Sequence, residues 1–170
     1  IGKMVYISLQ GNIQSKLRPG SWLPGIRNPH SEEVEWKFPE STSKETAMNA
    51  VSEAATSLDN FLERSNDKES RTIVIDTFTK AKWMDQVVLK FKEDGSDGGE
   101  LKAQVECCAT GFFPLIVPLA PLLNIIFCFI PFGDGGNCAR TMKILQKKVT
   151  EMSGTEIESK TIRYSLTNPK

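Results

Sequence analysis

The chain has 170 residues, and its 21 basic and 21 acidic residues cancel to a formal net charge of zero. This length accommodates one domain with a sizeable hydrophobic core. The charge balance gives no reason to expect a nucleic acid or an anionic membrane surface as partner. Because the chain begins IGKMVYISLQ, we expect a mature organellar or exported protein whose targeting peptide has been removed.

Residues 1–40 are predicted to form an extended N-terminal arm. Apolar residues alternate along the first ten positions, which favours a short strand or an extended segment. Four prolines between positions 19 and 39 exclude a long helix there. Trp22 and Trp36 are the anchors that would attach this arm to its own domain or to a partner.

Residues 41–170 are predicted to form the folded domain, which begins with a helix. Thr42 and Glu45 have the spacing of a capping box. The apolar residues that follow recur with helical spacing as far as Leu62. We interpret the next polar run, ERSNDKES, as a loop.

Three strand-like segments follow the helix, at 72–80, 84–93 and 100–109. In the second and third, apolar residues alternate with polar ones, which predicts a sheet with one buried and one wet face. The linker DGSDGG between them predicts a hairpin loop, so this pair should be antiparallel.

A second amphipathic helix is predicted after the GDGGN turn, and Gly154 ends it. Residues 156–166 alternate and would add an edge strand. The predicted fold class is therefore α+β: a single small domain with an antiparallel sheet of about four to five strands and two amphipathic helices packed on it. The proline-rich N-terminal arm and an apolar loop complete the chain.

No charged residue occurs between Glu106 and Asp134. A membrane-spanning helix needs about 20 apolar residues, but four prolines between positions 112 and 132 interrupt any such helix. A true membrane span is one alternative; in the others the segment lies over the protein's own sheet, against a hydrophobic ligand, or against a membrane or an integral membrane complex. The residues that we expect to make a docking contact are Phe112, Phe113, Leu115, Ile116, Leu119, Leu122, Ile126, Phe127, Phe129, Phe132, Trp22 and Trp36.

The cysteines are Cys107, Cys108, Cys128 and Cys138, and no two of them have Cys-x-x-Cys spacing. The single histidine, His30, is distant in sequence, so we expect no metal site. Buried free thiols and one or two disulfides remain the alternatives.

Candidate catalytic residues are few and scattered. His30 lies in the arm, Asp85 on a strand, and Cys138 at a helix N-terminus that would lower its pKa and make it reactive. No general base is identifiable beside Cys138, and Asp134 with Asn137 is typical of a turn and a helix cap. We therefore assign no catalytic residue and expect no cofactor, although the apolar loop would suit contact with a lipid or a pigment.

The order of elements over residues 41–150 resembles the domain of unknown function 1499 family, found in bacteria and in plastids. Its motif residues fit here as Asp85, Asp134, Gly136 and Asn137, with Gly111 and Arg140 also matching, while the strand arginines of the bacterial pattern are missing. The resemblance implies that 112–132 is an insertion between a strand and the last helix. It brings no established activity.

These observations predict a non-catalytic accessory or assembly subunit. It would dock on an integral membrane protein complex or a membrane surface through residues 112–132 and the aromatic arm. The resemblance implies a plastid thylakoid, photosynthetic setting, with an extracytoplasmic or secreted protein as the alternative. A soluble carrier of a lipid or pigment is the second functional hypothesis, and an enzyme of unknown reaction is the third.

Overall fold

A computed structural model describes residues 2–23, 28–93, 100–130 and 132–164. Its strands are β1 (Ser31–Lys37), β2 (Phe61–Asp67), β3 (Thr72–Phe78), β4 (Met84–Glu93), β5 (Leu101–Ala109) and β6 (Glu158–Arg163). Its helices are α1 (Gly2–Leu17), α3 (Lys44–Ser57), α4 (Ala120–Ile126) and α5 (Asn137–Ser153), with short 3-10 turns η1 (Pro19–Ser21) and η2 (Asn28–His30). The predicted α+β class is confirmed.

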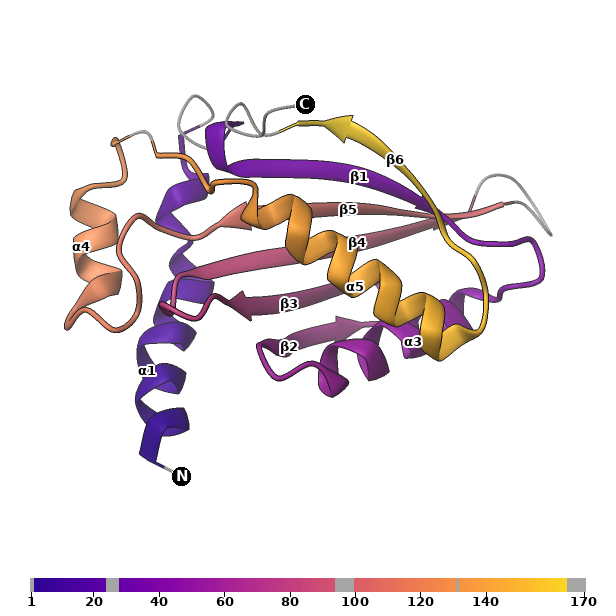
Figure 1. Ribbon diagram of the computed structural model, residues 1–170, viewed down its shortest axis with the longest axis horizontal. Coiled ribbons are helices and arrows are strands. Elements are labelled where there is room, and N and C mark those ends of the chain that lie inside the picture. Colours follow the sequence, from indigo (N-terminus) through magenta and orange to yellow (C-terminus); the bar gives the residue numbers. More distant parts are fainter. Residues whose placement is uncertain (1, 24–27, 94–99, 131, 165–170) are drawn as a thin grey trace.

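The six strands form one antiparallel sheet in the order β2-β3-β4-β5-β1-β6 (Figure 1), one strand more than the upper prediction. The register between β4 and β5 pairs Val87 with Cys107 and Leu89 with Val105. All four of these side chains are buried, as the alternation predicted. The predicted DGSDGG loop between these strands lies outside the described residues, but their antiparallel pairing is confirmed.

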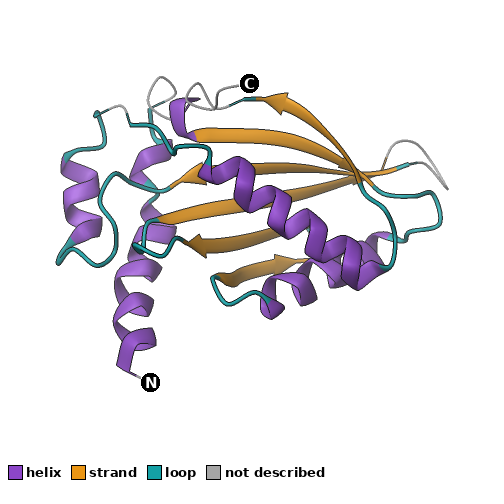
Figure 2. Cartoon of the chain, viewed as in Figure 1, coloured by secondary structure: helices purple, strands orange, loops and turns teal. Residues whose placement is uncertain are grey.

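Helices α3 and α5 pack together on the buried face of the sheet (Figure 2). Helix α5 buries Cys138, Met142, Leu145 and Val149 and ends at Gly154, whose φ of 66° is the left-handed conformation typical of that position. Beyond it, β6 forms an edge of the sheet, as predicted.

The structure corrects the predicted start of the first long helix and the loop after it. Ser43, not Thr42, caps α3, because its hydroxyl accepts a hydrogen bond from the backbone N–H of Thr46. The helix ends at Ser57, and the first five residues of the polar run that we interpreted as a loop belong to the edge strand β2, while its last three lie in a turn. An edge strand buries little of either face, so its sequence can stay as polar as that of a loop.

Residues 31–37 are extended, as the prediction for the arm states, but they form an inner strand of the sheet. β1 lies between β5 and β6 and places Trp36 fully inside the core. Pro29 and Pro39 lie just outside this strand, where they remove no hydrogen bond of the ladder. Trp36 therefore belongs to the core of the domain and to no docking surface.

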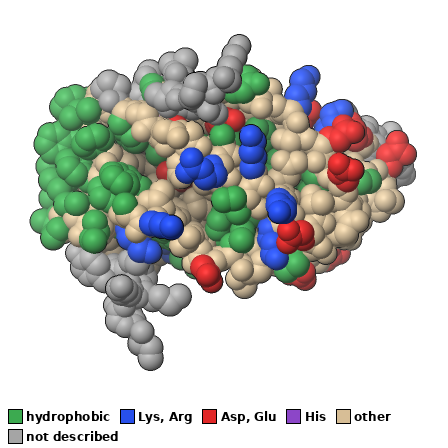
Figure 3. All heavy atoms as spheres, in the orientation of Figure 1, with side chains coloured by type: hydrophobic (Ala, Val, Ile, Leu, Met, Phe, Trp, Pro, Cys, Tyr) green, Lys and Arg blue, Asp and Glu red, His purple; other side chains and the backbone are tan. Residues whose placement is uncertain are grey.

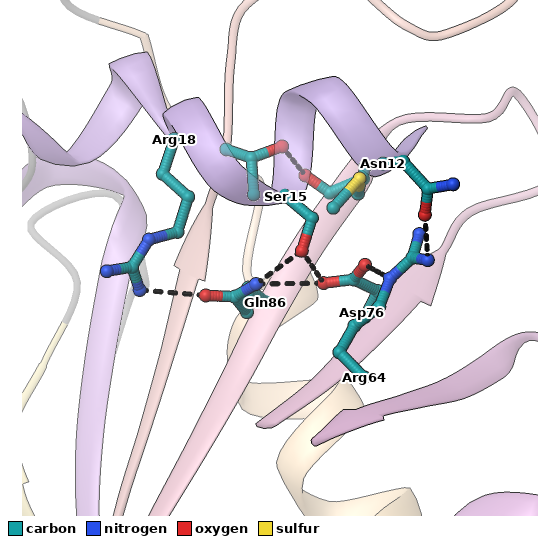
Figure 4. A network of polar contacts seen from close by, with 8 residues as sticks. Asn12, Ser15, Arg18, Arg64, Asp76 and Gln86 are labelled. Atoms are coloured by element: carbon teal, nitrogen blue, oxygen red, sulfur yellow. Dashed lines mark hydrogen bonds and ion pairs between the residues drawn. The ribbon is translucent and has the colours of Figure 1, made fainter. Parts of the chain in front are cut away.

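The predicted strand or extended segment over the first ten residues is wrong, because Gly2–Leu17 form helix α1. The helix lies against the polar face of the sheet, opposite α3 and α5. Polar side chains fix it there (Figure 4): Ser15 donates to Asp76, and Arg18 donates to Gln86. The alternation of apolar residues along the first ten positions cannot reveal such contacts, because they depend on strands that lie far along the chain.

Asp76 is the centre of this polar network and is fully buried. Its carboxylate accepts hydrogen bonds from Ser15 and Gln86 at 3.1 and 2.9 Å and forms an ion pair with Arg64. We expect Asp76→Ala to lower the free energy of unfolding by about 3 kcal/mol, since it leaves the Arg64 guanidinium without its partner. Chemical denaturation followed by circular dichroism measures this change.

The control for this measurement is Asp59→Ala, at an exposed position, where a change within about 0.5 kcal/mol is expected. Equal effects of the two substitutions would show that the network does not stabilise the docking of α1.

Candidate functional site

Residues 112–130 fold into a small lobe at one end of the molecule, next to α1, and we call it the apolar lobe (Figure 1). Pro114 and Pro118 precede its short helix α4, and Pro121 lies in the first turn of that helix. The lobe has a small core of its own, in which Leu115 and Ala120 pack with Met84. Of the helices that the structure describes, none has the length and apolarity needed to cross a membrane.

The outer face of the apolar lobe consists of large hydrophobic side chains, each between 40% and 68% exposed. These residues are Phe112, Ile116, Leu119, Leu122, Ile126 and Phe129. Figure 3 shows hydrophobic side chains gathered over this end of the molecule. A contiguous apolar surface of this kind marks an interaction site on a soluble protein.

The inner side of the same lobe is held by amide side chains. Gln10 donates to the carbonyl of Leu115 at 2.9 Å and accepts from the N–H of Ala120 at 3.0 Å. Asn124 bonds both backbone groups of Phe113. Gln10 of α1 and Asn124 of the lobe are both buried, so these amides lie on the inner side of the lobe, while the six residues of the outer face are exposed.

Leu119 shows that this arrangement costs free energy. It holds a left-handed backbone conformation, with φ of 60°, at the N-terminus of α4. For a bulky L-residue that conformation is unfavourable by about 1 kcal/mol or more. The Leu119 side chain is mostly exposed, so its burial does not compensate for the backbone strain.

The predicted docking residues divide into three groups. Seven are exposed: the six on the outer face of the apolar lobe, and Trp22. Phe113, Phe127 and Phe132 are half-buried within aromatic contacts. Leu115 and Trp36 are buried, so they are corrected to core residues.

Sequence reasoning missed the residues that hold the lobe. Gln10 and Gln14 lie on a helix that was predicted to be extended, so nothing indicated their role. Asn124 gave a signal, because it is the only amide side chain in 112–132. A single amide inside an apolar run indicates a buried backbone contact.

Gly111 connects β5 to the apolar lobe and lies between Gln14 of α1 and Asn124 of α4. A Cβ atom there would overlap the side chains of Asn124 and Gln14.

We expect Gly111→Ala to lower the free energy of unfolding by about 2 kcal/mol and to expose the lobe to protease. Gly11→Ala is the matched control: its Cβ meets nothing closer than 3.4 Å, and alanine favours the helix. If the Gly111→Ala variant resists protease as well as the control variant does, this prediction is wrong.

A cleft of about 840 Å³ lies between the β3–β4 hairpin and the start of α5, and we call it the Asp85 cleft. Asp85, Asp134, Asn137 and Arg140 all line it. The structure thus brings together residues that the sequence analysis grouped as a motif. Gly136 precedes α5 in a left-handed conformation, with φ of 76°.

Asp85 lies at the start of β4 and is almost completely buried. Its carboxylate accepts a hydrogen bond from the side-chain amide of Asn137. The pKa of Asp85 is raised to about 7: burial is the main cause, the Asn137 hydrogen bond opposes the shift, and the nearby charge of Asp134 adds to it.

Asp134 performs the turn and capping role that its spacing predicted. Its carboxylate accepts from the N–H groups of Gly136 at 3.1 Å and Cys138 at 2.8 Å. The predicted reactive thiol at Cys138 is wrong, because Cys138 is fully buried. Its hydrogen bond with Cys107 and its burial raise the pKa of the thiol well above its usual value.

All four cysteines lie in the described residues and are free thiols. Cys107 is buried and Cys108 is half-buried, as their opposite directions on a strand predicted.

His30, the third candidate catalytic residue, is also buried. Its ring forms a hydrogen bond with the carbonyl of Gly20 and stacks on Phe132. It does not line the Asp85 cleft.

No protein-family model and no curated protein matches this chain.

The Asn137 side chain is the hydrogen-bond donor to the buried Asp85 carboxylate. We expect Asn137→Ala to lower the free energy of unfolding by about 2 kcal/mol, because it leaves a buried acceptor without its partner. Asn60→Ala, at an exposed position lining the same cleft, should change it by less than about 0.5 kcal/mol. Thermal and chemical denaturation measure both, and equal stabilities would refute a structural role for the Asp85–Asn137 contact.

Proposed function

We propose that this protein is a non-catalytic accessory subunit that docks on an integral membrane protein complex through the outer face of the apolar lobe. One observation carries the proposal: six large apolar side chains of the lobe are exposed, while its one amide side chain, Asn124, is buried. A loop that merely covered its own sheet would do the reverse, because apolar burial is the main driving force for such packing.

The chemistry of the lobe indicates the kind of partner. Its surface offers no charged side chain of its own, since none occurs between Glu106 and Asp134. Association must therefore come from apolar contact and shape, as in the dry centre of a stable protein interface. Trp83 lies at the margin of the lobe, where its indole N–H donates to the carbonyl of Phe112 at 2.8 Å. Aromatic residues of this kind are frequent anchors at interfaces.

A carrier of a lipid or pigment remains the alternative, and it would need a cavity beneath the loop. No residue of 112–130 lines the Asp85 cleft or the second cleft, of about 850 Å³, between α1 and the polar face of the sheet. Leu115 and Ala120 instead fill the space under the lobe. This packing favours docking over ligand enclosure.

For the location, we propose a photosynthetic complex of the plastid thylakoid. This part rests on the resemblance of residues 41–150 to a family that occurs in plastids. An extracytoplasmic or secreted protein is the alternative. To test docking and location, the source membranes are solubilised in a mild detergent and separated on a native gel. Mass spectrometry then identifies the proteins in the band that holds this chain. Comigration with an integral membrane complex supports docking, and recovery as a small free species overturns it.

The double substitution Ile126→Asp and Phe129→Asp tests the surface itself. Both side chains are more than half exposed, at 51% and 61%, so charging them should leave the fold intact while placing two carboxylates in an apolar interface. We expect the variant to lose comigration with the complex, by at least tenfold in the bound fraction, because each uncompensated charge costs more than 1.4 kcal/mol in such an interface.

Leu62→Asp with Ile162→Asp is the matched control, because these residues are similarly exposed, at 43% and 53%, and lie on the two edge strands. It should comigrate like the unsubstituted chain. If Ile126→Asp with Phe129→Asp unfolds the domain, or binds as the control does, docking through the lobe is wrong.

A further inference from the structure

Three potential metal ligands from three elements meet inside the domain. Asp85 comes from β4, Cys107 from β5 and Cys138 from the first turn of α5. One ligand atom from each lies within 4.8 Å of the other two, and all three residues are buried. The spacing of these residues along the sequence could not predict this group, because the three ligands lie on separate strands and a helix.

The strand register explains how Asp85 and Cys107 meet. Val87 is paired with Cys107 and Asp85 with Ala109, so Asp85 and Cys107 are diagonal neighbours on the same face of the sheet. Helix α5 then places Cys138 above them. The Asp134 carboxylate fixes this position by accepting from the backbone N–H of Cys138 at 2.8 Å.

The dimensions suit one small cation. A tetrahedral ion with metal–sulfur bonds of about 2.3 Å and a metal–oxygen bond of about 2.1 Å holds its ligand atoms about 3.5 to 3.8 Å apart. That separation falls within the 4.8 Å limit that the three atoms satisfy. Asn137 donates to one oxygen of the Asp85 carboxylate, which is the kind of contact that orients a ligand toward a metal.

The electrostatics around the three groups favour a positive charge. Two further carboxylates lie beside the group: Asp134 is near Asp85, and Glu32 is paired with Cys107 across the β1–β5 ladder. A bound divalent cation would replace the protons of the two thiols.

We propose that Asp85, Cys107 and Cys138 bind a single thiophilic divalent cation of the zinc class, with the fourth position facing the Asp85 cleft. Two sulfur ligands select zinc-class ions over magnesium or calcium. Asp85 lines the cleft, so the ion can enter from it and a water molecule can complete its coordination. This site is separate from the apolar lobe and does not depend on the proposed docking.

Cobalt titration of the full chain tests the site directly. The reduced protein is stripped with a chelator, freed of it, and titrated with Co²⁺. We expect a near-ultraviolet thiolate-to-cobalt band and the visible bands of tetrahedral Co²⁺, saturating at one equivalent and abolished by one equivalent of Zn²⁺. Native mass spectrometry should find one Zn²⁺ per chain.

The four cysteines supply a matched control. Cys108→Ser with Cys128→Ser removes two half-buried thiols outside the site and should retain the full spectrum. Cys107→Ser and Cys138→Ser should each lose most of the thiolate band, and Asp85→Asn should weaken cobalt binding by at least tenfold. Circular dichroism verifies that each variant is folded.

Several outcomes would overturn the proposal. One is a folded, reduced chain that gives no thiolate band and retains no Zn²⁺. Another is a band that persists in Cys107→Ser or Cys138→Ser but disappears in the control, which would place the metal on other thiols. A third is a disulfide between Cys107 and Cys138 in the protein as isolated, found by thiol counting and peptide mapping. Should a serine variant fail to fold, the unsubstituted chain's spectrum and zinc stoichiometry alone decide.

Discussion

Backbone hydrogen bonding in the segment after β5 is the constraint on which the rest of this structure depends. A run with four prolines pairs its own backbone groups in a helix only over the short α4, and buried groups without partners are costly. Gln10, Gln14 and Asn124 supply those partners: Gln14 bonds the carbonyl of Thr110 at 2.8 Å, and the other two bond residues 113–120. Without α1 in position, the apolar lobe would have no fixed shape.

This constraint accounts for the unusual surface. The buried amides share the inner side of the lobe with Leu115 and Ala120, while the six large apolar residues of the outer face remain exposed. The helix that supplies the amides is held in turn by Asp76 and its neighbours on the polar face of the sheet. A polar network on one side of the molecule therefore determines which apolar residues are presented at its end.

The apolar lobe and the Asp85 cleft are connected along the chain. The lobe begins where β5 ends and returns through Phe132 and the glycine-rich turn to α5. Phe132 lines the cleft and also contacts the ring of Phe112 on the lobe, with ring centroids 5.7 Å apart. The two sites are distinct in chemistry: one is apolar and open, and the other is lined by Asp85 and Asp134 together with Lys80 and Arg140. A partner seated on the lobe would lie close to the entrance of the cleft.

The sequence by itself determined the α+β class, the strands with regular alternation, the last helix with its glycine stop, and the segment that carries no charge. These follow from local periodicity and composition, which a single chain displays directly. Only the tertiary structure decided that residues 2–17 form a helix, that Trp36 and Leu115 are buried, and that Asp85 meets Cys107 and Cys138. Each of these depends on contacts between residues far apart in the chain, and such contacts override local propensity without leaving a local pattern.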